Sequence, residues 1–371
     1  MGSTCMTSVS TLFVAVVHVE VILAADSVVA VVRDPSNNSS HHPQTSCPKL
    51  NPRRYSHCFL KVEANTAGSL GVLKKEVSVM NKLQCRRHTV RVVYSARREL
   101  YSYVVMTLFG PNLMQLRKDC RTNTLTASTV CRVGIHALYA IKQVHEIGYV
   151  HRDIKPANMV IGRRGTEARM IFLIDYGMAR AYAIWEDGHV RIRRQREHVL
   201  LRGTTRYCSP TVHARKEQGR KDDLWALIYV LIELHAGLPW RGITEPEIGA
   251  MKSALPDEVL MADCPPEWIK ILKYIRTLVY ESRPDYKKIF DIMMESVARL
   301  KITFDDPYDW EKRNGTMLPA INDTLEGQQT LTRSTLSNSA SSTNETRKSK
   351  ERCFMYPTTD PKEFEANDIG I

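Results

Sequence analysis

Two short motifs in the middle of the chain carry residue types that can transfer a phosphoryl group. Residues 151–158 read H-R-D-I-K-P-A-N, and the triplet D-Y-G begins seventeen residues after Asn158, at Asp175. Together they supply a carboxylate that can accept a proton, a lysine that can face a phosphate and two oxygen ligands for magnesium. Such a set can move the terminal phosphate of ATP to a hydroxyl group.

The overall composition is that of a globular protein with a sizeable core. The 371 residues are 43% hydrophobic and 25% charged. The formal net charge of +12 favours anionic partners, and charge alone does not choose among nucleic acid, a membrane surface and an acidic protein. The nine cysteines are scattered without a C-x-x-C pair, so a zinc site is not expected and a reduced, intracellular setting is the simplest interpretation.

The apolar stretch from Val9 to Val32 has the character of a signal peptide or a membrane span. No Lys or Arg precedes it, and it contains His18, Glu20 and Asp26. A basic segment is usual before a signal peptide, and an Asp at the centre of a membrane helix costs about 2.5–3.5 kcal/mol on insertion scales. We therefore expect neither, and predict a cytoplasmic protein, with the nucleus as an additional location.

Composition along the chain predicts three parts. Residues 1–52 form an atypical apolar segment followed by a polar linker, since 33–54 are rich in Pro, Ser, Asn, His and Arg. Residues 53–302 hold most of the apolar pattern and form the domain. Residues 303–371 form a Ser/Thr-rich, largely disordered tail, of which 334–350 are the least apolar.

Hydrophobic periodicity predicts a small β-rich half followed by a larger helical half, an α+β fold. Strands are predicted around Lys61, over 101–108 and over 171–174. Helical spacing over 72–83 and an amphipathic pattern over 130–144 predict two helices. The run from Leu224 to Leu234 is apolar on every face except Glu233, which predicts a helix buried inside the larger half.

Several further motifs occur in the order found in eukaryotic protein kinases, and the chain resembles that family over about residues 57–302. Within it, the chain most resembles the casein kinase I superfamily and its tau-tubulin kinase-like branch. The motifs that carry the resemblance are F-L-K-V-E at 59–63, Y-V-V-M-T-L at 103–108, G-P-N-L at 110–113, H-R-D-I-K-P-A-N, R-G-T-T-R-Y-C-S-P at 202–210, G-R-K-D-D-L-W at 219–225, L-P-W at 238–240 and R-P-D-Y at 283–286.

The resemblance implies a two-lobed fold, with a small lobe at about 53–108, a large lobe at about 110–302, and ATP with Mg²⁺ between them. Asp153 is then the catalytic base and Lys155 faces the transferring phosphate, a lysine typical of Ser/Thr kinases. Asn158 and Asp175 are the predicted magnesium ligands, because hard oxygen donors suit that ion. Tyr176 replaces the usual Phe and adds a hydroxyl that needs a partner if buried.

The same resemblance assigns the nucleotide site. Lys61 is predicted to hold the α- and β-phosphates, with Glu76 orienting it through an ion pair. Met106 is predicted to lie behind the adenine, and the backbone of Thr107 and Phe109 to bond the adenine edge.

Other residues are expected to support the loop from 151 to 158. Thr204 is predicted to bridge Asp153 and Lys155. Asp223 is predicted to bond the loop's backbone, and Asp222 to be its solvated neighbour.

The segment from Arg191 to Arg206 is basic. It predicts either an ordinary solvated face or a site for an acidic or already phosphorylated protein substrate, bound through Arg–carboxylate or Arg–phosphate pairs. Relatives often add a lysine after the L-P-W turn to complete an anion site, but here that stretch carries Glu245 and Glu247. The arginines are Arg191, Arg193, Arg194, Arg196, Arg202 and Arg206.

One expected part has no counterpart in the sequence. Kinases place a G-x-G-x-x-G loop on a hairpin before the nucleotide-binding lysine, yet no glycine occurs between Gly2 and Gly68. The chain could have an alternative start, could be a degraded kinase that binds nucleotide poorly, or could build substitute strands from its β-branched N-terminal run. The intact downstream catalytic residues favour the first account.

The sequence therefore predicts a monomeric Ser/Thr protein kinase that uses ATP and Mg²⁺, with no nucleic-acid partner expected. The alternative is a pseudokinase-like scaffold whose basic segment docks acidic partners. A third possibility is a kinase tethered to a membrane by residues 9–32.

Overall fold

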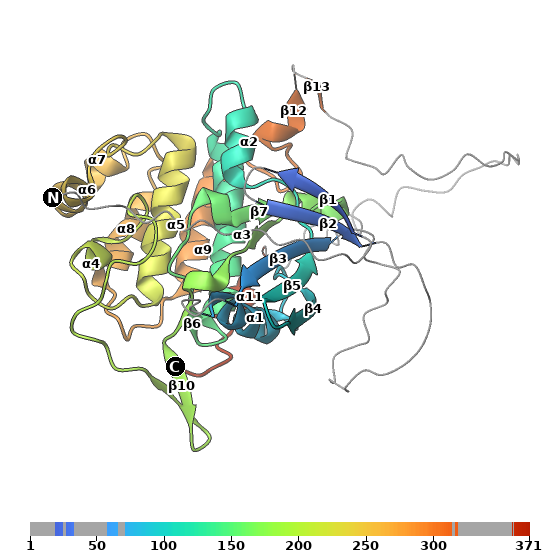
Figure 1. The fold of residues 1–371 in the computed structure, drawn as a ribbon. Coiled ribbons are helices and arrows are strands. Elements are labelled where there is room, and N and C mark those ends of the chain that lie inside the picture. The colour runs from blue at the N-terminus through green and yellow to red at the C-terminus, as the bar shows by residue number, and fades with distance from the viewer. Residues whose placement is uncertain are drawn as a thin grey trace, which may run out of the picture.

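A five-stranded antiparallel sheet forms the small lobe (Figure 1). In this computed structural model, which describes residues 19–24, 27–32, 58–65, 71–313, 316–317, 358 and 360–371, the strands lie in the order β1-β2-β3-β5-β4. Their bounds are Val19–Ala24 (β1), Ser27–Val32 (β2), Cys58–Ala64 (β3), Val92–Arg97 (β4) and Tyr101–Thr107 (β5).

The first two strands come from the apolar N-terminal stretch. They pair over all six residues of each strand, from Val19 opposite Val32 to Ala24 opposite Ser27, and Val29 of β2 lies opposite Phe59 of β3. The hairpin therefore occupies the position before Lys61 where kinases carry their glycine-rich loop, but no glycine lies between its strands. This arrangement matches the account in which the β-branched run supplies substitute strands.

Helix α1 (Val72–Leu83) packs on this sheet and carries Glu76 on its buried face. The carboxylate of Glu63, from β3, accepts hydrogen bonds from the backbone N–H groups of Val72 (3.2 Å) and Leu73 (2.9 Å). These bonds satisfy two donors that a helix leaves open at its N-terminus. A strand residue thereby fixes the start of the helix that holds Glu76.

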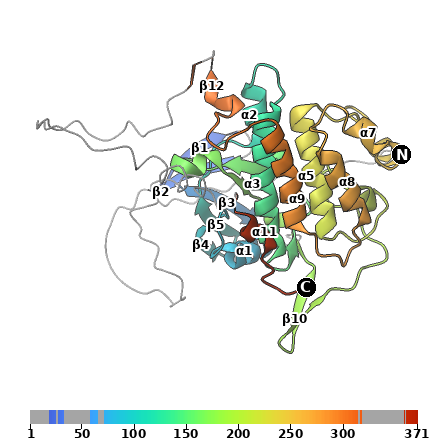
Figure 2. The same cartoon turned by 180° about the vertical axis from the view of Figure 1, so that it is seen from behind.

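The large lobe is built mainly from helices and lies beside the sheet (Figures 1 and 2). Short strand pairs, β6 with β9, β7 with β8 and β10 with β11, lie in its connecting segments. The helices are α2 (Leu113–Asp119), α3 (Ala127–His145), α4 (Pro210–His213), α5 (Arg220–His235), α6 (Glu245–Ala254), α7 (Asp257–Leu260), α8 (Trp268–Thr277), α9 (Tyr286–Arg299) and α11 (Pro361–Glu365). The strands are β6 (Tyr149–Val150), β7 (Met159–Ile161), β8 (Ile171–Leu173), β9 (Arg180–Ala181), β10 (Ala183–Glu186), β11 (His189–Ile192), β12 (Lys312–Arg313) and β13 (Thr316–Met317).

Helices α3 and α5 form the centre of the core. Helix α5 is buried from Asp222 to Leu234, as its sequence predicts, and Glu233 pairs with Arg117 and Arg206. Helix α3 differs from the amphipathic prediction, because it is buried on every side from residue 129 to 145. Its polar face is covered by other segments, and Arg132, for example, donates to the carbonyl of Pro307.

The domain does not end where the sequence pattern suggests. Residues 303–311 pack beside α3, where Arg132 lies over the ring of Tyr308. Helix α11 lies against α9, and Phe364 is completely buried there. We predicted a largely disordered tail from residue 303, and these two segments differ from that prediction. Periodicity missed them because each contributes only a few apolar side chains.

The hairpin provides a direct test of the small lobe. Replacing Val29 by proline removes a backbone donor in a strand that has a paired neighbour on both sides. We expect the free energy of unfolding to fall by about 2 kcal/mol, measured by urea denaturation, and amide exchange over 58–64 to accelerate. Val29→Thr keeps the N–H and the β-branched shape and is the control. Equal stability of the two variants would contradict a structural role for this hairpin.

Candidate active site

The predicted catalytic base lies in a hydrogen-bonded loop with three neighbours on its side chain. Asp153 accepts a hydrogen bond from the Lys155 ammonium at 2.7 Å and another from the Thr204 hydroxyl at 2.8 Å. The side-chain amide of Asn158 donates to both the carbonyl (3.0 Å) and the carboxylate (3.2 Å) of Asp153. The carboxylate is thus held in one orientation by residues that the sequence singled out.

A buried carboxylate on α5 holds the backbone of this loop. Asp223 accepts from the N–H groups of His151 (2.7 Å) and Arg152 (2.9 Å), and it also contacts the His145 ring at 2.9 Å. Burial raises the pKa of Asp223, but these donors outweigh burial and the pKa lies below the usual value. The predicted structural role of Asp223 is confirmed.

Asp222 was predicted to be solvated, and that prediction was wrong. Its carboxylate is buried, and it accepts from the Ser209 hydroxyl at 2.5 Å and from the N–H of Gly219 at 2.7 Å. The adjacent aspartates therefore bond to different segments: Asp223 to the catalytic loop and Asp222 to the start of α4. Adjacent helix positions point about 100° apart, so both can be buried only where the helix end is covered all round.

The small lobe contributes a lysine, Lys61, to the candidate site. The Lys61 ammonium lies 2.8 Å from Glu76 and 3.3 Å from Asp175. Burial alone would lower the pKa of Lys61, but the two carboxylates raise it above the usual value, so the lysine is charged at neutral pH. The predicted ion pair between Lys61 and Glu76 is present, and Asp175 joins it.

Asp175 has a backbone conformation that few residues other than glycine adopt, with φ of +67°. Such a conformation costs free energy and persists where the surroundings impose it. The following Tyr176 is buried, and its hydroxyl donates to the Leu173 carbonyl at 2.9 Å. The extra hydroxyl of D-Y-G therefore has the partner it requires.

Asn158 and Asp175 have the donor atoms that magnesium prefers. The side-chain nitrogen of Asn158 donates to Asp153, so its side-chain oxygen is the atom that can act as a ligand. The Asp175 side chain is 42% exposed, so its carboxylate is accessible. Among the described residues no cluster of three or more His, Cys, Asp or Glu forms a metal cage. Two protein oxygens with phosphates and water completing the shell fit Mg²⁺.

The segment between the lobes provides backbone groups for an adenine. Met106 is buried near the end of β5, next to Thr107. The N–H of Thr107 donates to the Arg91 carbonyl at 3.0 Å. Because this N–H already donates to Arg91, the backbone group of Thr107 that we expect to bond the adenine edge is its carbonyl. Phe109 packs against Phe172, with ring centroids 4.9 Å apart.

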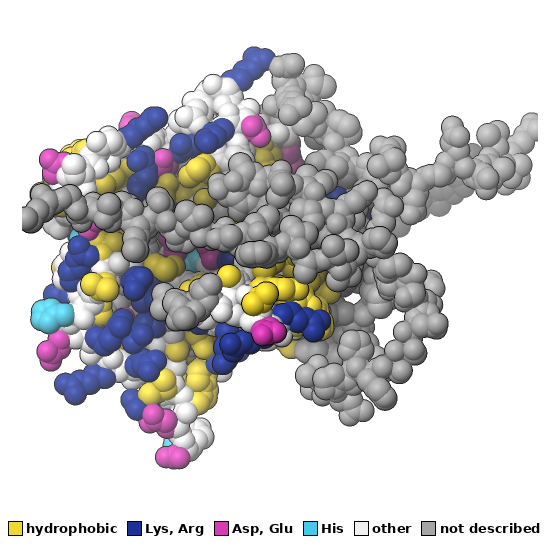
Figure 3. Space-filling view, viewed as in Figure 1, with side chains coloured by type: hydrophobic (Ala, Val, Ile, Leu, Met, Phe, Trp, Pro, Cys, Tyr) yellow, Lys and Arg dark blue, Asp and Glu magenta, His cyan; other side chains and the backbone are white. Residues whose placement is uncertain are grey.

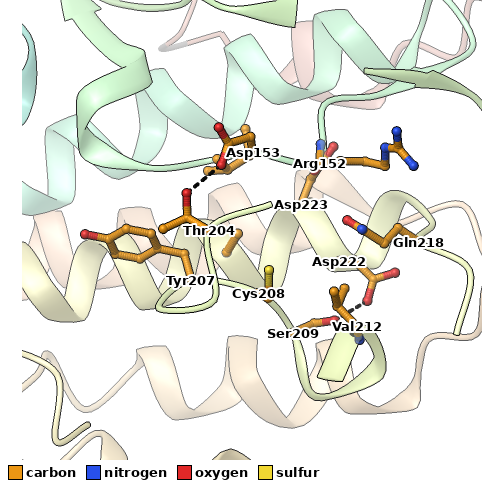
Figure 4. A pocket seen from close by; sticks show the side chains of 12 residues that line it. Arg152, Asp153, Thr204, Tyr207, Cys208, Ser209, Val212, Gln218, Asp222 and Asp223 are labelled. Carbon is orange, nitrogen blue, oxygen red and sulfur yellow. Dashed lines mark hydrogen bonds between the residues drawn. The ribbon is translucent and has the colours of Figure 1, made fainter. Parts of the chain in front are cut away.

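A small pocket opens beside Asp153, on the side of the loop that carries Thr204 (Figure 4). Its lining includes Tyr207, Cys208 and Gln218, and the hydroxyl of Thr204, another lining residue, points at Asp153. No contact between Thr204 and Lys155 accompanies this bond among the described residues, so the predicted bridge is present on its Asp153 side.

Lys252, on α6, was not predicted from the sequence. Its ammonium is almost completely buried and donates to the carbonyls of Thr205 and Cys208, each at 2.7 Å. It also lies over the rings of Tyr229 (4.8 Å) and Trp240 (5.0 Å). Lys252 therefore holds the loop that carries Thr204. A single lysine in a helix has no sequence signal for this role.

The basic segment is only partly engaged with the protein itself. Arg191 pairs with Glu186, Arg196 with Glu217, and Arg206 with Glu233. Arg193 and Arg194 are exposed, while the backbone of Arg193 is fixed by Tyr182 and Tyr280. Lys and Arg side chains gather on the surface over the connection from β11 to α4 (Figure 3).

Comparison with known proteins agrees with this geometry. The family model of the protein kinase domain matches residues 55–298. This chain is a member of the protein kinase family. A putative serine/threonine-protein kinase of Caenorhabditis elegans is 43% identical over 257 residues, which are 69% of this chain and 74% of the relative.

Two other relatives show which branches of the kinase family this chain is similar to. An inactive tau-tubulin kinase of Caenorhabditis elegans is 37% identical over 58% of this chain and 78% of its own length. Casein kinase I homolog 3 of Schizosaccharomyces pombe is 33% identical over 60% of this chain and 52% of its own length. The predicted resemblance to casein kinase I and tau-tubulin kinases is confirmed. Within the described part of the chain, no helix is both long and apolar enough to cross a membrane.

The buried ammonium of Lys252 predicts a pH effect on stability. Burial lowers its pKa to about 7, against about 10.4 in an unfolded chain. Between these values the unfolded chain binds more protons, so raising the pH stabilises the folded state. We expect the stability difference between wild type and Lys252→Met to shift by about 2 kcal/mol in favour of wild type from pH 7 to pH 9.

The neighbours of Lys252 do not titrate in this window. Burial lowers the pKa of His213 and raises that of Cys208 to about 12, so both are neutral, and the Arg206 guanidinium stays charged. Urea denaturation of both variants at the two pH values measures the shift. A difference that does not change with pH would show that Lys252 keeps an ordinary pKa.

Proposed function

We propose that this chain is a serine/threonine protein kinase that transfers the γ-phosphate of ATP to a protein hydroxyl group. The observation that carries the proposal is the convergence of two sets of residues from distant parts of the chain. Asp153 is held between Lys155 and Thr204, and Lys61 is held between Glu76 and Asp175. Phosphoryl transfer requires positioning and charge neutralisation more than covalent chemistry, and these residues supply both.

In this mechanism Asp153 orients the substrate hydroxyl and accepts its proton. The Lys155 ammonium neutralises charge that develops on the transferring phosphate, and Lys61 holds the remaining phosphates of ATP. Bound Mg²⁺ would neutralise phosphate charge, and Asn158 and Asp175 are the residues that would hold it. Between the lobes, the carbonyl of Thr107 and the backbone of Phe109 would bond the adenine edge.

We also propose that the substrates are acidic or already phosphorylated. Arg193, Arg194 and Arg202 are exposed on this segment, and the backbone of Arg193 is held in place by Tyr182 and Tyr280. A guanidinium group pairs well with a carboxylate or phosphate in two parallel hydrogen bonds. The arginines that already form ion pairs fit the alternative of an ordinary charged face. The proposal therefore rests on Arg193, Arg194 and Arg202.

A second candidate function is a binding scaffold with little or no catalysis. It is favoured by the hairpin of β1 and β2, which has no glycine to let backbone N–H groups approach the phosphates closely. One relative is also named as inactive. In this case the basic segment would dock acidic partners without phosphorylating them.

Phosphorylation of casein, an acidic protein, tests the enzyme proposal. Wild type should transfer labelled phosphate from MgATP to casein, and Asp153→Asn should lower kcat by about 10²–10⁴, because an amide cannot accept the proton. Asn keeps the shape of Asp153 and can still accept from Thr204. A wild-type signal no greater than that of Asp153→Asn would contradict the proposal.

Nucleotide binding separates the two candidate functions. A rise in melting temperature with micromolar MgATP, lost in Lys61→Met, is expected for the enzyme. An inactive chain without that rise would support the scaffold.

The exposed arginines predict a salt-dependent substrate preference. In the double variant Arg193→Ala/Arg194→Ala, KM for an acidic peptide should rise about tenfold at low salt, because two charge-assisted contacts are lost. KM for ATP should stay unchanged, and the difference should shrink at high NaCl concentration. Initial-rate kinetics at both salt concentrations measure these effects.

Arg191→Ala is the matched control for this variant. It removes the same kind of charge from the same segment, but Glu186 already occupies its guanidinium group. An equal rise in KM for Arg191→Ala would indicate a general charge effect and would refute a specific site at Arg193 and Arg194.

A further inference from the structure

The described C-terminal segment, residues 360–371, packs along the surface of the large lobe. It begins with α11, which lies against α9 and whose first turn is capped by Asp360, and it continues to Ile371 near β10 (Figure 2). Glu363 of α11 also lies 3.8 Å from Arg87, just past the end of α1. The segment therefore lies where the residues that follow α1 meet the large lobe.

Apolar side chains anchor the segment at its two ends. Phe364 is completely buried, stacks on Phe290 of α9 with ring centroids 4.4 Å apart, and meets the edge of Tyr139 of α3. Ile369 and Ile371 pack against the cluster of Val150, Tyr182 and Ala183. Stabilisation by burial grows with the apolar area removed from water, so the fully buried ring of Phe364 is the main anchor.

The charges of the segment complement those of the surface that it contacts. Residues 360–371 carry four acidic side chains and one basic one. Asp368 pairs with Arg86 at 2.7 Å, Glu363 accepts from the Tyr139 hydroxyl at 3.0 Å, and Arg283 donates to the Ala366 carbonyl at 2.7 Å. An acidic peptide on a basic surface is both attracted and oriented.

Some of these contacts connect the segment to the residues that follow α1. Arg86 lies just past the end of α1, and besides Asp368 it donates to the side chain of Gln143 (3.1 Å) and the carbonyl of Glu146 (3.3 Å). The N–H of Asp368 in turn donates to the Glu146 carboxylate at 2.7 Å. The segment thus adds Asp368 to the direct bonds between Arg86, just past the helix that carries Glu76, and the large lobe.

Other contacts connect the segment to the residue that precedes the catalytic loop. Val150, which Ile369 and Ile371 contact through their cluster, directly precedes His151. Arg220 donates to both the Tyr182 hydroxyl (3.1 Å) and the Ile371 carbonyl (3.0 Å). The strand pair of β6 and β9, which flanks the catalytic loop, is therefore covered by the segment.

We propose that this surface is a peptide-docking site whose ligand is the chain's own acidic segment 360–371, and that the docked segment holds α1 and the catalytic loop in their active arrangement. Undocking would free Arg86 from Asp368 and uncover the apolar cluster beneath the catalytic loop. The effect on nucleotide binding rests on the proposed function, whereas docking itself does not. The segment then acts as a positioning element for Glu76, which orients Lys61.

The full-length variant Phe364→Asp tests the proposal, with Glu365→Ala as the control because Glu365 is exposed on the same helix. In Phe364→Asp, amide exchange should accelerate at least about tenfold over 360–371, 84–90 and 149–151. KM for ATP, or the dissociation constant of MgATP, should rise roughly fivefold. Glu365→Ala should match wild type in both measurements.

A synthetic peptide of residues 357–371 then distinguishes docking from a general defect. Added to Phe364→Asp, it should restore exchange protection over 84–90 and the affinity for MgATP, while the same peptide with Phe364→Ala should not. If Phe364→Asp does not fold, Asp368→Ala removes the contact with Arg86 without placing a charge in the core, and it should accelerate exchange over 84–90 alone.

Two outcomes would overturn the proposal. Exchange over 360–371 in wild type as fast as in an unstructured peptide would show that the segment does not dock. Faster exchange over 360–371 in Phe364→Asp, with 84–90 and MgATP affinity unchanged, would show that it docks without positioning α1. A wild-type chain that binds no MgATP would refute the proposed function, and the exchange and peptide measurements would still decide whether the segment docks.

Discussion

The buried carboxylate of Asp223 is the interaction on which the arrangement of the site depends. It accepts two backbone N–H groups of the catalytic loop and contacts His145, which in turn reaches the Tyr286 hydroxyl at 2.7 Å. Arg152 has a φ of +68°, a strained conformation that these bonds help to impose. Because the loop's backbone is fixed by α5, the Asp153 side chain can be held by Lys155 and Thr204.

Covering α3 on every side has a cost that other segments offset. A helix buried all round leaves its polar side chains without water, and each needs a partner in the protein. Arg132 finds backbone carbonyls near residue 307, His136 bonds the Thr358 hydroxyl at 2.9 Å, and Lys142 pairs with Glu146 at 3.4 Å. Segments beyond the family match at 55–298 therefore complete the core of the large lobe.

The candidate catalytic residues could be singled out from the sequence because they occur in short motifs with fixed local geometry. The strand around Lys61, the helix carrying Glu76 and the buried helix of 224–234 also followed from periodicity, since a local pattern decides which face is apolar. The buried position of Asp222 did not follow, because it depends on a distant residue, Ser209, meeting the start of α5.

By itself, the sequence determined the family, the two-part fold and the residues that could perform phosphoryl transfer. Only the tertiary structure decided that the apolar N-terminal stretch pairs with β3 as a hairpin, that Lys252 holds the loop of Thr204, and that residues 360–371 return to the large lobe. The physical reason is the same in each case. Strand pairing, a buried ammonium and a docked segment depend on partners far away in the chain, and local periodicity carries no record of them.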